Sequence, residues 1–319
     1  MTRTFVASIQ PQMQIDEVYR IVDRQLRANR QGNLYLLMQL QDNTGTISAM
    51  RWNADEKMAE KFNKGNYVRI NAASQVHNGV LQLIVNQLQL VDESQISKED
   101  FESASRVDVD ELWKQVGEML HELNDEGLRA IAMLFYEDPN IADLLRTAPA
   151  GIKAHHAYPG GLLEHIVSLM SLARGVANHY LDLSEDMLIV GAFLHDIGKL
   201  EELAFDGELS YTDSGQLLGH LVQGVQMIDR RILELKTRGI QVDSDTVLQL
   251  QHIIVSHHGY LEHGSPKVPM TLEAIVFHYL DEMDAKLSSA RAMVLADRTK
   301  DRWTPYNPTL GRKILKPTS

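Results

Sequence analysis

Hydrophobic and polar residues alternate with a period of two over the first part of the chain. The alternation predicts β-strands, because successive side chains of a strand point to opposite faces. Turn-forming residues separate the strands, among them Gly45 and the pair Asn78-Gly79. One helical segment, residues 53–62, lies between the third and fourth strands, with Asn53 as its expected N-cap. The strands are expected near residues 18–28, 33–41, 46–52, 66–76 and 80–91.

Five strands with one helix between the third and fourth give the element order of an OB-fold. The stretch 40–47, followed by Ala49 and Trp52, also resembles the strand–turn–strand segment of nucleic-acid-binding OB-folds. Such domains stack bases on aromatic rings and follow phosphates with basic side chains. We expect Trp52 to fill the barrel interior instead of stacking on a base. The candidate nucleic-acid contacts are Tyr35, Arg51, Tyr67 and Arg69, with Arg20, Arg24 and Arg27 on the first strand.

Beyond a polar stretch at residues 92–106, apolar residues recur at helical spacing. Three short helices are expected first, in a connector that packs one domain on the other. From residue 151 onward the pattern predicts helices throughout. These later helices are expected from after Pro159 to about 180, from Met187 to His195-Asp196 with Gly198 as the stop, from Gly215, over 248–258 and over 272–286.

The composition restricts any metal chemistry to histidine and carboxylate ligands. The 319 residues include no cysteine, which excludes disulfides, thiolate-bound zinc, iron–sulfur clusters and a thiol nucleophile. No run of about 18 apolar residues occurs, so neither a membrane span nor a membrane partner is expected. The first residues, Met1–Phe5, lack the charged and then apolar order of a signal peptide, and a cytoplasmic location is expected.

The net charge of −12 argues against a nucleic-acid partner only until it is divided along the chain. Residues 1–95 hold ten Lys and Arg against nine Asp and Glu, whereas the rest of the chain holds 21 against 34. Ten of the 13 histidines lie between His155 and His263. The acidity therefore belongs to a histidine-rich segment that could hold divalent cations, and a cation would reverse the local field for a phosphate.

The histidines and aspartates of this segment fall at helix ends and on apolar helices. Two metals about 3.5–4 Å apart need a bridging carboxylate and further ligands on each side. His195-Asp196 at a helix end could supply one imidazole and that bridge, with the other ligands coming from different helices. Each histidine taken alone fits a buried, hydrogen-bonded core residue equally well, so the ordered set of motifs decides the interpretation.

The ordered motifs Gly-Leu-Leu-Glu-His165, His195-Asp-Ile-Gly-Lys199, Gly-His220 and His257-His-Gly259, with a late helical aspartate, resemble the HD superfamily of metal-dependent phosphohydrolases. The resemblance implies an all-α domain with two divalent ions. Its ligand set, carried over by motif, is His165, His195, Asp196, His220, His257, His258 and Asp281, with Asp196 as the bridge.

Some positions stay open in this comparison. His258 could replace His257 or contact the substrate, and Asp284 is the alternative to Asp281. Three-metal members have a glutamate four positions before the first histidine, where this chain has Gly161, so a third ion is not expected. Lys199 matches the lysine that contacts phosphate in the family.

An OB-fold followed by a helical connector and an HD domain is the arrangement of the YhaM-type 3′–5′ exoribonucleases, which the whole chain resembles. The resemblance implies a hydrolase that removes mononucleotides from the 3′ end of single-stranded RNA, with single-stranded DNA as a further substrate. A water between the two ions would be the nucleophile, Lys199 and the ions would stabilise the phosphate, and His220 could protonate the leaving oxygen. The ligand types suit manganese first, with Co, Fe, Ni or Zn as alternatives.

Two alternatives differ in class from the exoribonuclease. One is an HD phosphohydrolase acting on small nucleotides with a regulatory OB domain, and the other is a non-catalytic RNA-binding adaptor. The basic tail could contact RNA phosphates or a neighbouring subunit, which leaves a homo-oligomer open. The expected organisation is multidomain α+β: an OB-fold at 1–92, a connector at 93–150, an HD domain at 151–300 and a basic, proline-containing tail at 301–319.

Overall fold

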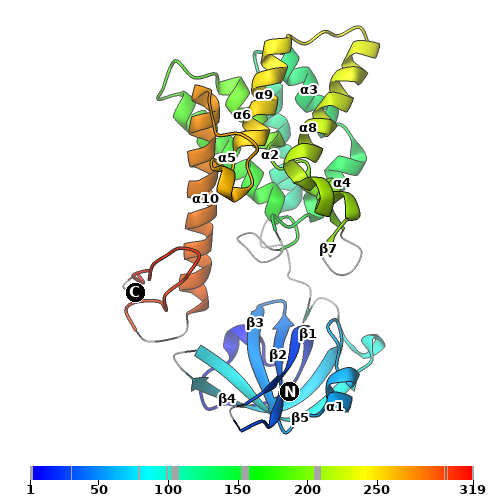
Figure 1. Cartoon of the computed structure of the whole chain (residues 1–319), viewed down its shortest axis with the longest axis vertical. Helices are drawn as coiled ribbons and strands as arrows, with labels where there is room; N and C mark the ends of the chain where they lie inside the picture. Colours follow the sequence, from blue (N-terminus) through cyan, green and yellow to red (C-terminus); the bar gives the residue numbers. More distant parts are fainter. Residues whose placement is uncertain are drawn as a thin grey trace. The chain divides into compact units, whose positions relative to one another are not determined.

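The structure of this protein is a computed structural model (Figure 1). It describes residues 3–29, 31–77, 80–97, 100–101, 108–151, 158–204, 210–297, 299 and 301–317. The chain divides into two compact units. One combines Met1–Arg106 with Met293–Ser319, and the other is Val107–Ala292.

The first unit contains a closed five-stranded barrel, which confirms the OB-fold expectation. Its strands follow each other around the barrel in the order β1-β2-β3-β5-β4, and β3 and β5 pair in parallel. Buried side chains at alternate positions fill the interior, among them Tyr19, Leu36, Ile70 and Leu83. The elements are β1 (Gln14–Ala28), β2 (Leu34–Asp42), β3 (Gly45–Trp52), α1 (Glu56–Lys61), β4 (Tyr67–His77) and β5 (Val80–Val91).

Two local predictions in the barrel are wrong. The helix after β3 begins at Glu56, and its N-cap is Asp55, whose side chain accepts a hydrogen bond from the Met58 backbone N–H. Asn53 cannot cap it because its φ of 54° places it in a left-handed turn two residues earlier. Trp52 is 41% exposed at the end of β3, because it lies on the face of the strand opposite to the buried Ile47 and Ala49.

The second unit is helical, as expected. Its helices are α2 (Val109–His121), α3 (Glu126–Tyr136), α4 (Pro139–Thr147), α5 (Gly161–Ala177), α6 (Glu185–Leu194), α7 (Lys199–Glu202), α8 (Asp213–Thr237), α9 (Ser244–Ser256) and α10 (Leu272–Ala296), with α10 ending beyond the unit. A two-residue ladder, β6 (Leu203–Ala204) with β7 (Ser210–Tyr211), interrupts them. Many of these helices begin after a side chain that caps the first backbone N–H groups, as Asp125, Ser184 and Thr212 do.

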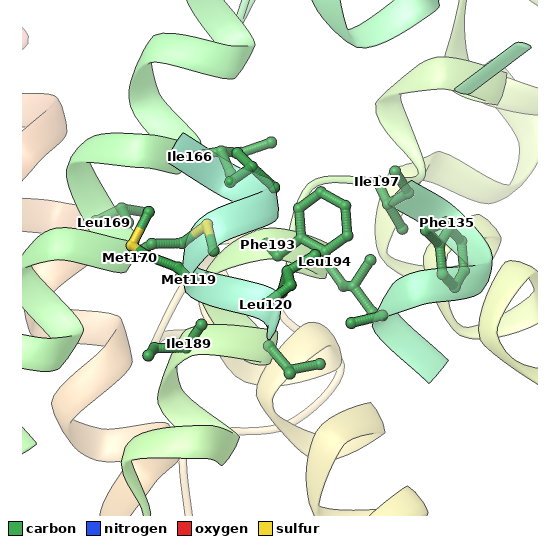
Figure 2. Packing of buried hydrophobic residues seen from close by; sticks show 14 of the residues in the cluster. Met119, Leu120, Phe135, Ile166, Leu169, Met170, Ile189, Phe193, Leu194 and Ile197 are labelled. Carbon is green, nitrogen blue, oxygen red and sulfur yellow. The ribbon is translucent and has the colours of Figure 1, made fainter. Parts of the chain in front are cut away.

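The three helices of the predicted connector share one hydrophobic core with the helices that follow them. Figure 2 shows side chains from α2 (Met119, Leu120), α3 (Phe135) and α6 (Phe193, Leu194) in this one core, with Ile197 next to Phe135. All of α6 from Met187 onward is buried. This central helix therefore sets where its C-terminal end, and the His195-Asp196 pair, must lie.

The described part of the tail folds back on itself. Trp303 bridges Leu315, and Asn307 bridges Arg312, in antiparallel fashion. The Asn78-Gly79 turn and His155 lie outside the described residues. None of the helices in the described part of the chain combines the length and apolarity that crossing a membrane requires.

Candidate metal centre

The centre is built around the C-terminal end of α6. His195 is fully buried, and its Nδ1 donates to the Ala192 carbonyl oxygen at 2.9 Å, since a carbonyl can only accept. The next residue, Asp196, is 3% exposed. The end of an apolar, buried helix thus places an imidazole and a carboxylate in the interior, where each needs a hydrogen-bond, charge or metal partner.

A first group of ligand atoms joins α5, α6 and α10. His165, His195 and Asp281 place one donor atom each within 4.8 Å of one another. The His165 Nε2 atom lies 3.1 Å from Asp281 Oδ1, and the His165 and His195 ring centroids are 5.3 Å apart. All three residues belong to the ligand set that the sequence motifs predict.

A second group joins α8 to the end of α9. His220, His257 and His258 meet the same 4.8 Å criterion. The Nε2 atoms of His220 and His258 are 3.3 Å apart, and the rings of His257 and His258 are 4.5 Å apart. Both members of the adjacent histidine pair therefore face the site.

Asp196 lies between the two groups. Its Oδ2 atom is 3.2 Å from His195 Nε2, and its Oδ1 atom is 3.5 Å from His220 Nε2 and 3.7 Å from His257 Nε2. The Lys199 ammonium donates to Asp196 Oδ2 at 2.6 Å and to the Ala150 carbonyl at 2.7 Å. The structure thus brings all seven predicted ligands together, with Asp196 in the position that a bridging carboxylate would take.

The donor set fits a divalent cation. Among the described residues, the buried atoms His195 Nε2 and Asp196 Oδ1 have no hydrogen-bond partner. Such atoms are costly to bury unless something else satisfies them. Imidazole nitrogens and carboxylate oxygens together suit first-row transition ions. The residues present can therefore hold the ions that an HD domain implies.

Each imidazole is oriented by a hydrogen bond to its Nδ1 atom, on the side of the ring away from the metal-binding groups. The Nδ1 atoms of His257 and His258 face the carbonyl oxygens of Ile254 and His263, at 2.8 and 3.1 Å. A carbonyl accepts only, so Nδ1 carries the proton and Nε2 keeps a free lone pair. The rings consequently present the tautomer that a metal ligand needs before any ion arrives.

Two carboxylates orient the remaining histidines. Glu202 accepts a hydrogen bond from the His220 Nδ1–H at 3.1 Å and another from the His220 backbone N–H at 3.1 Å. Asp284 accepts a hydrogen bond from the His165 Nδ1–H at 2.8 Å and one from the Ser168 hydroxyl at 2.7 Å. Asp281 instead lies near the Nε2 atom of His165, on the side of the metal-binding group. This arrangement favours Asp281 as the metal ligand and Asp284 as the residue that orients the His165 ring.

The sequence patterns did not single out Glu202. A signal was present, because Glu202 is a carboxylate between the apolar residues Leu200 and Leu203, and charged residues are seldom buried without a partner. The side chain is indeed 9% exposed. The pattern could have marked the pair Glu201-Glu202, but it could neither choose between the two nor name His220 as the partner.

The charges of the site are set by burial and by neighbouring groups. Burial lowers the pKa of His165, but hydrogen bonds to Asp281 and Asp284 outweigh it and raise the pKa to about 9. Burial raises the pKa of Asp196, yet Lys199 and His195 bring it well below its usual range. Burial and the neighbouring His195 hold the pKa of His257 well below that of a free imidazole. Asp196 is thus ionised and His257 neutral, as cation binding requires, whereas His165 must give up its proton when a cation binds.

Two glycines allow α8 to approach the His195-Asp196 turn. Gly198 was expected to end α6 as a C-terminal stop, but its φ is −62° and needs no glycine. The reason is space, because a Cβ at Gly198 would lie 2.0 Å from the His220 carbonyl oxygen. Gly219, at φ 71°, kinks α8 directly before His220. The kink and the close contact together set the direction of that imidazole.

The predicted aromatic contacts of the barrel are divided between two places. Tyr35 on β2 is paired in register with Trp52 on β3, and the two ring centroids are 5.1 Å apart. Tyr35 is also paired with Arg27 on β1, so Arg27, Tyr35 and Trp52 form one row across three strands. Tyr67, at the start of β4, packs its ring edge-on against Phe101 at 4.8 Å.

The predicted arginine contacts are engaged within the barrel unit. Arg51 is paired in register with the fully buried Leu36, and its Nη1 donates to the Val85 carbonyl at 3.3 Å. It therefore lies on the opposite face of β3 from Trp52. Arg69 is exposed and forms an ion pair with Asp16 at 2.7 Å. Neither arginine is brought beside the Tyr35–Trp52 pair by strand register.

Comparison with known proteins agrees with both halves of this description. The HD domain family matches residues 162–286, and the OB-fold nucleic acid binding domain family matches residues 19–91. The 3′–5′ exoribonuclease YhaM of Bacillus subtilis is 32% identical over 312 residues, covering 96% of this chain and 95% of that protein. The chain belongs to the YhaM family of 3′–5′ exoribonucleases.

A second YhaM, from Bacillus velezensis, is 31% identical over the same coverage. Among solved structures, the second OB-fold domain of replication protein A from Methanococcus maripaludis covers 30% of this chain and 100% of its own, at 16% identity and a TM-score of 0.25. The YhaM relatives extend over both units, so family membership applies to the barrel and the metal centre together.

Proposed function

We propose that this chain is a metal-dependent 3′–5′ exoribonuclease that hydrolyses single-stranded RNA, and single-stranded DNA as a second substrate, to mononucleotides. One observation supports it above all others. Asp196 lies between two groups of imidazole and carboxylate donors, within 3.7 Å of His195, His220 and His257. This is the arrangement that a pair of divalent ions sharing one carboxylate requires.

The two ions would be held by His165, His195 and Asp281 on one side and by His220, His257 and His258 on the other, with Asp196 shared. When bound, they supply the positive charge that activates a water and neutralises a phosphate. Manganese is the proposed ion, and Co, Fe, Ni and Zn fit the same donors.

The chain's own residues have separable tasks in this proposal. Asp196 stays ionised beside Lys199, whose ammonium already lies at the site and can meet a phosphate oxygen. His220 has its Nδ1 proton held by Glu202, so its Nε2, 3.5 Å from Asp196 Oδ1, is the atom that is turned toward the metal-binding groups. To protonate a leaving sugar oxygen, this ring would have to be released from metal binding and take up a proton at Nε2.

The barrel is the proposed guide for the single strand. Its row of Arg27, Tyr35 and Trp52 offers one cation and two rings on the same face. Base stacking on such rings contributes about 1–3 kcal/mol per base. Tyr67, Arg51 and Arg69 stay predicted contacts.

The test uses full-length protein, Mn²⁺ and a 5′-labelled single-stranded RNA, with a DNA oligonucleotide of the same sequence in parallel. We expect a ladder that shortens from the 3′ end. Asp196→Ala should lower the rate at least about 1,000-fold, whereas Asp182→Ala, an exposed aspartate before α6, should leave it unchanged. Replacing Mn²⁺ by each of the other ions ranks the metals.

An HD phosphohydrolase acting on small nucleotides predicts the opposite result. Intact RNA together with rapid turnover of free nucleotides would reject the exoribonuclease and support that alternative. RNA binding with no hydrolysis under any metal would support the non-catalytic adaptor. The cytoplasmic location and a homo-oligomeric state stay predictions.

A further inference from the structure

The C-terminal residues Asp301–Pro317, called here the C-terminal hairpin, form two arms that are joined by hydrogen bonds. Thr304 is only 1% exposed. Its backbone N–H donates to the Ile314 carbonyl at 2.9 Å, and its hydroxyl accepts from the Ile314 N–H at 2.9 Å. The Trp303–Leu315 bridge lies next to this buried contact. One small buried residue therefore fixes the two arms against each other.

The hairpin is also attached to the chain that precedes it. Lys316 donates its Nζ to the Thr299 carbonyl at 2.6 Å and pairs with Asp297 at 3.0 Å. Its backbone N–H donates to the Arg302 carbonyl at 2.9 Å. The amide of Asn307 reaches the sulfur of Met293 on α10 at 3.5 Å. These contacts hold the hairpin in a defined orientation on the end of α10.

The outward side chains of the hairpin combine rings and positive charge. Trp303 is 51% exposed and Tyr306 is 60% exposed. Arg302, Arg312 and Lys313 are exposed as well. Asp301 is the only acidic residue from 301 to 317, in a chain whose net charge is −12. The hairpin is therefore a basic, aromatic surface on an acidic protein.

Large aromatic rings on a rigid, positively charged support match the chemistry of a single-stranded nucleic acid. Unpaired bases offer flat faces to stack on, and each phosphate offers a negative charge. The hairpin residues also belong to the same compact unit as the barrel. The bases and phosphates of one unpaired strand match both the rings and the charges of the hairpin, so a single-stranded nucleic acid is the proposed occupant.

We propose that the C-terminal hairpin is a second single-stranded nucleic-acid contact, separate from the barrel row and from the metal centre. Trp303 and Tyr306 stack on bases, while Arg302, Arg312 and Lys313 contact phosphates. This role rests on the proposed function, since it gives the exonuclease an additional hold on a long strand.

The experiment measures binding without catalysis. Fluorescence anisotropy with a labelled 20-nucleotide single-stranded RNA in EDTA, at several salt concentrations, gives Kd for the full-length chain. Trp303→Ala/Tyr306→Ala removes the rings, and Arg312→Glu/Lys313→Glu reverses two charges. Matched controls are Tyr180→Ala, a tyrosine 54% exposed in the other unit, and Lys114→Glu/Lys236→Glu, two exposed lysines there.

We expect the ring variant to weaken binding at least about fivefold per ring that stacks. The charge variant should weaken binding and lower the slope of log Kd against log salt by about 1.4, since each lost phosphate contact removes about 0.7. Both controls should bind like the unchanged protein. For hydrolysis, the hairpin variants should raise KM for long RNA and leave kcat unchanged.

Unchanged RNA affinity in both hairpin variants overturns the proposal and leaves the exonuclease assignment intact. Light scattering measures the mass of the particle and so detects whether the hairpin joins copies of this chain. If the ring variant changes the mass of the particle while RNA affinity stays the same, the hairpin is a contact between copies of this chain. If the unchanged protein binds RNA through the hairpin but never hydrolyses it, the exonuclease proposal fails and the binding site stands.

Discussion

The metal centre and the barrel surface differ in how closely the structure brings their predicted residues together. Six residues from α5 to α10 meet around Asp196, as their motifs implied. The four barrel candidates instead divide between two faces, and only Tyr35 lies beside a further exposed ring, Trp52. A metal fixes its ligands to one point, whereas a single strand can be followed by residues spread along a surface.

The difference also concerns how the residues are supported. Each imidazole of the metal centre is held from behind by a carbonyl or a carboxylate, as His220 is by Glu202. On the barrel, Arg69 is exposed and its ion pair with Asp16 is at the surface, where such pairs contribute little. A site built for chemistry is rigid before its ligand binds, and a guide surface need not be.

The largest effect is expected where that support is removed from the metal centre. Glu202→Ala should lower metal affinity about 10- to 100-fold, because His220 loses the acceptor that orients it. Glu202→Gln should lose less, since the amide oxygen can still accept from Nδ1. Isothermal titration with Mn²⁺ measures the affinity directly.

The neighbouring Glu201→Gln serves as the matched control, because Glu201 pairs with Arg230 and not with a histidine. Thermal melts of all three variants distinguish a local effect from general destabilisation. Equal loss of metal affinity for Gln and Ala at position 202 would contradict the orienting role.

A smaller effect is expected on the barrel. Trp52→Ala should weaken binding of a labelled single-stranded RNA about fivefold or more, because one stacking ring is lost. Trp52→Phe keeps a ring and should recover most of the affinity. Neither change should alter kcat on a saturating substrate, and a fall in kcat with unchanged affinity would place Trp52 in folding and not in guiding.

The smallest effect concerns the pH dependence of stability. His252 accepts a hydrogen bond at Nε2 from the Met270 backbone N–H at 2.8 Å, and burial lowers its pKa. The unfolded chain therefore takes up the proton first as the pH falls through about 6.5. The stabilisation is present above that pH and is lost below it.

Urea unfolding between pH 7.5 and 5.5 measures this contribution. His252→Gln, whose side-chain oxygen can accept from Met270, should show a weaker fall in the free energy of unfolding on acidification. His121→Gln, an exposed histidine on α2, should keep the full fall. Identical slopes for the two variants would show that other groups determine the pH dependence.

Much of the fold could be predicted because the elements obey local patterns. Period-two alternation located the strands of the barrel, and the short motifs named the residues that meet around Asp196, since strand alternation and each motif are properties of neighbouring residues. The misplaced start of α1 has a different cause. Asn53 has the chemistry of an N-cap, but the turn after β3 places it at positive φ, and Asp55 takes the role.

The remaining errors have different causes. Trp52 is large and apolar like a core residue, but it is out of phase with the buried Ile47 and Ala49 and therefore faces outward. Glu202 acquires its meaning from His220, eighteen positions later. Local sequence can indicate that a buried carboxylate needs a partner, but tertiary packing decides which residue that is.

The close contact at Gly198 has a consequence for how the site assembles. A Cβ there would also lie 2.7 Å from the Gly224 backbone nitrogen, so α8 rests directly on the backbone that follows Asp196. His220 can reach its place only when α8 has docked against that turn. His220 is therefore out of reach in any partly folded chain in which α8 is detached. Weakened metal binding should consequently report the detachment of this one helix before the barrel or the rest of the core has unfolded.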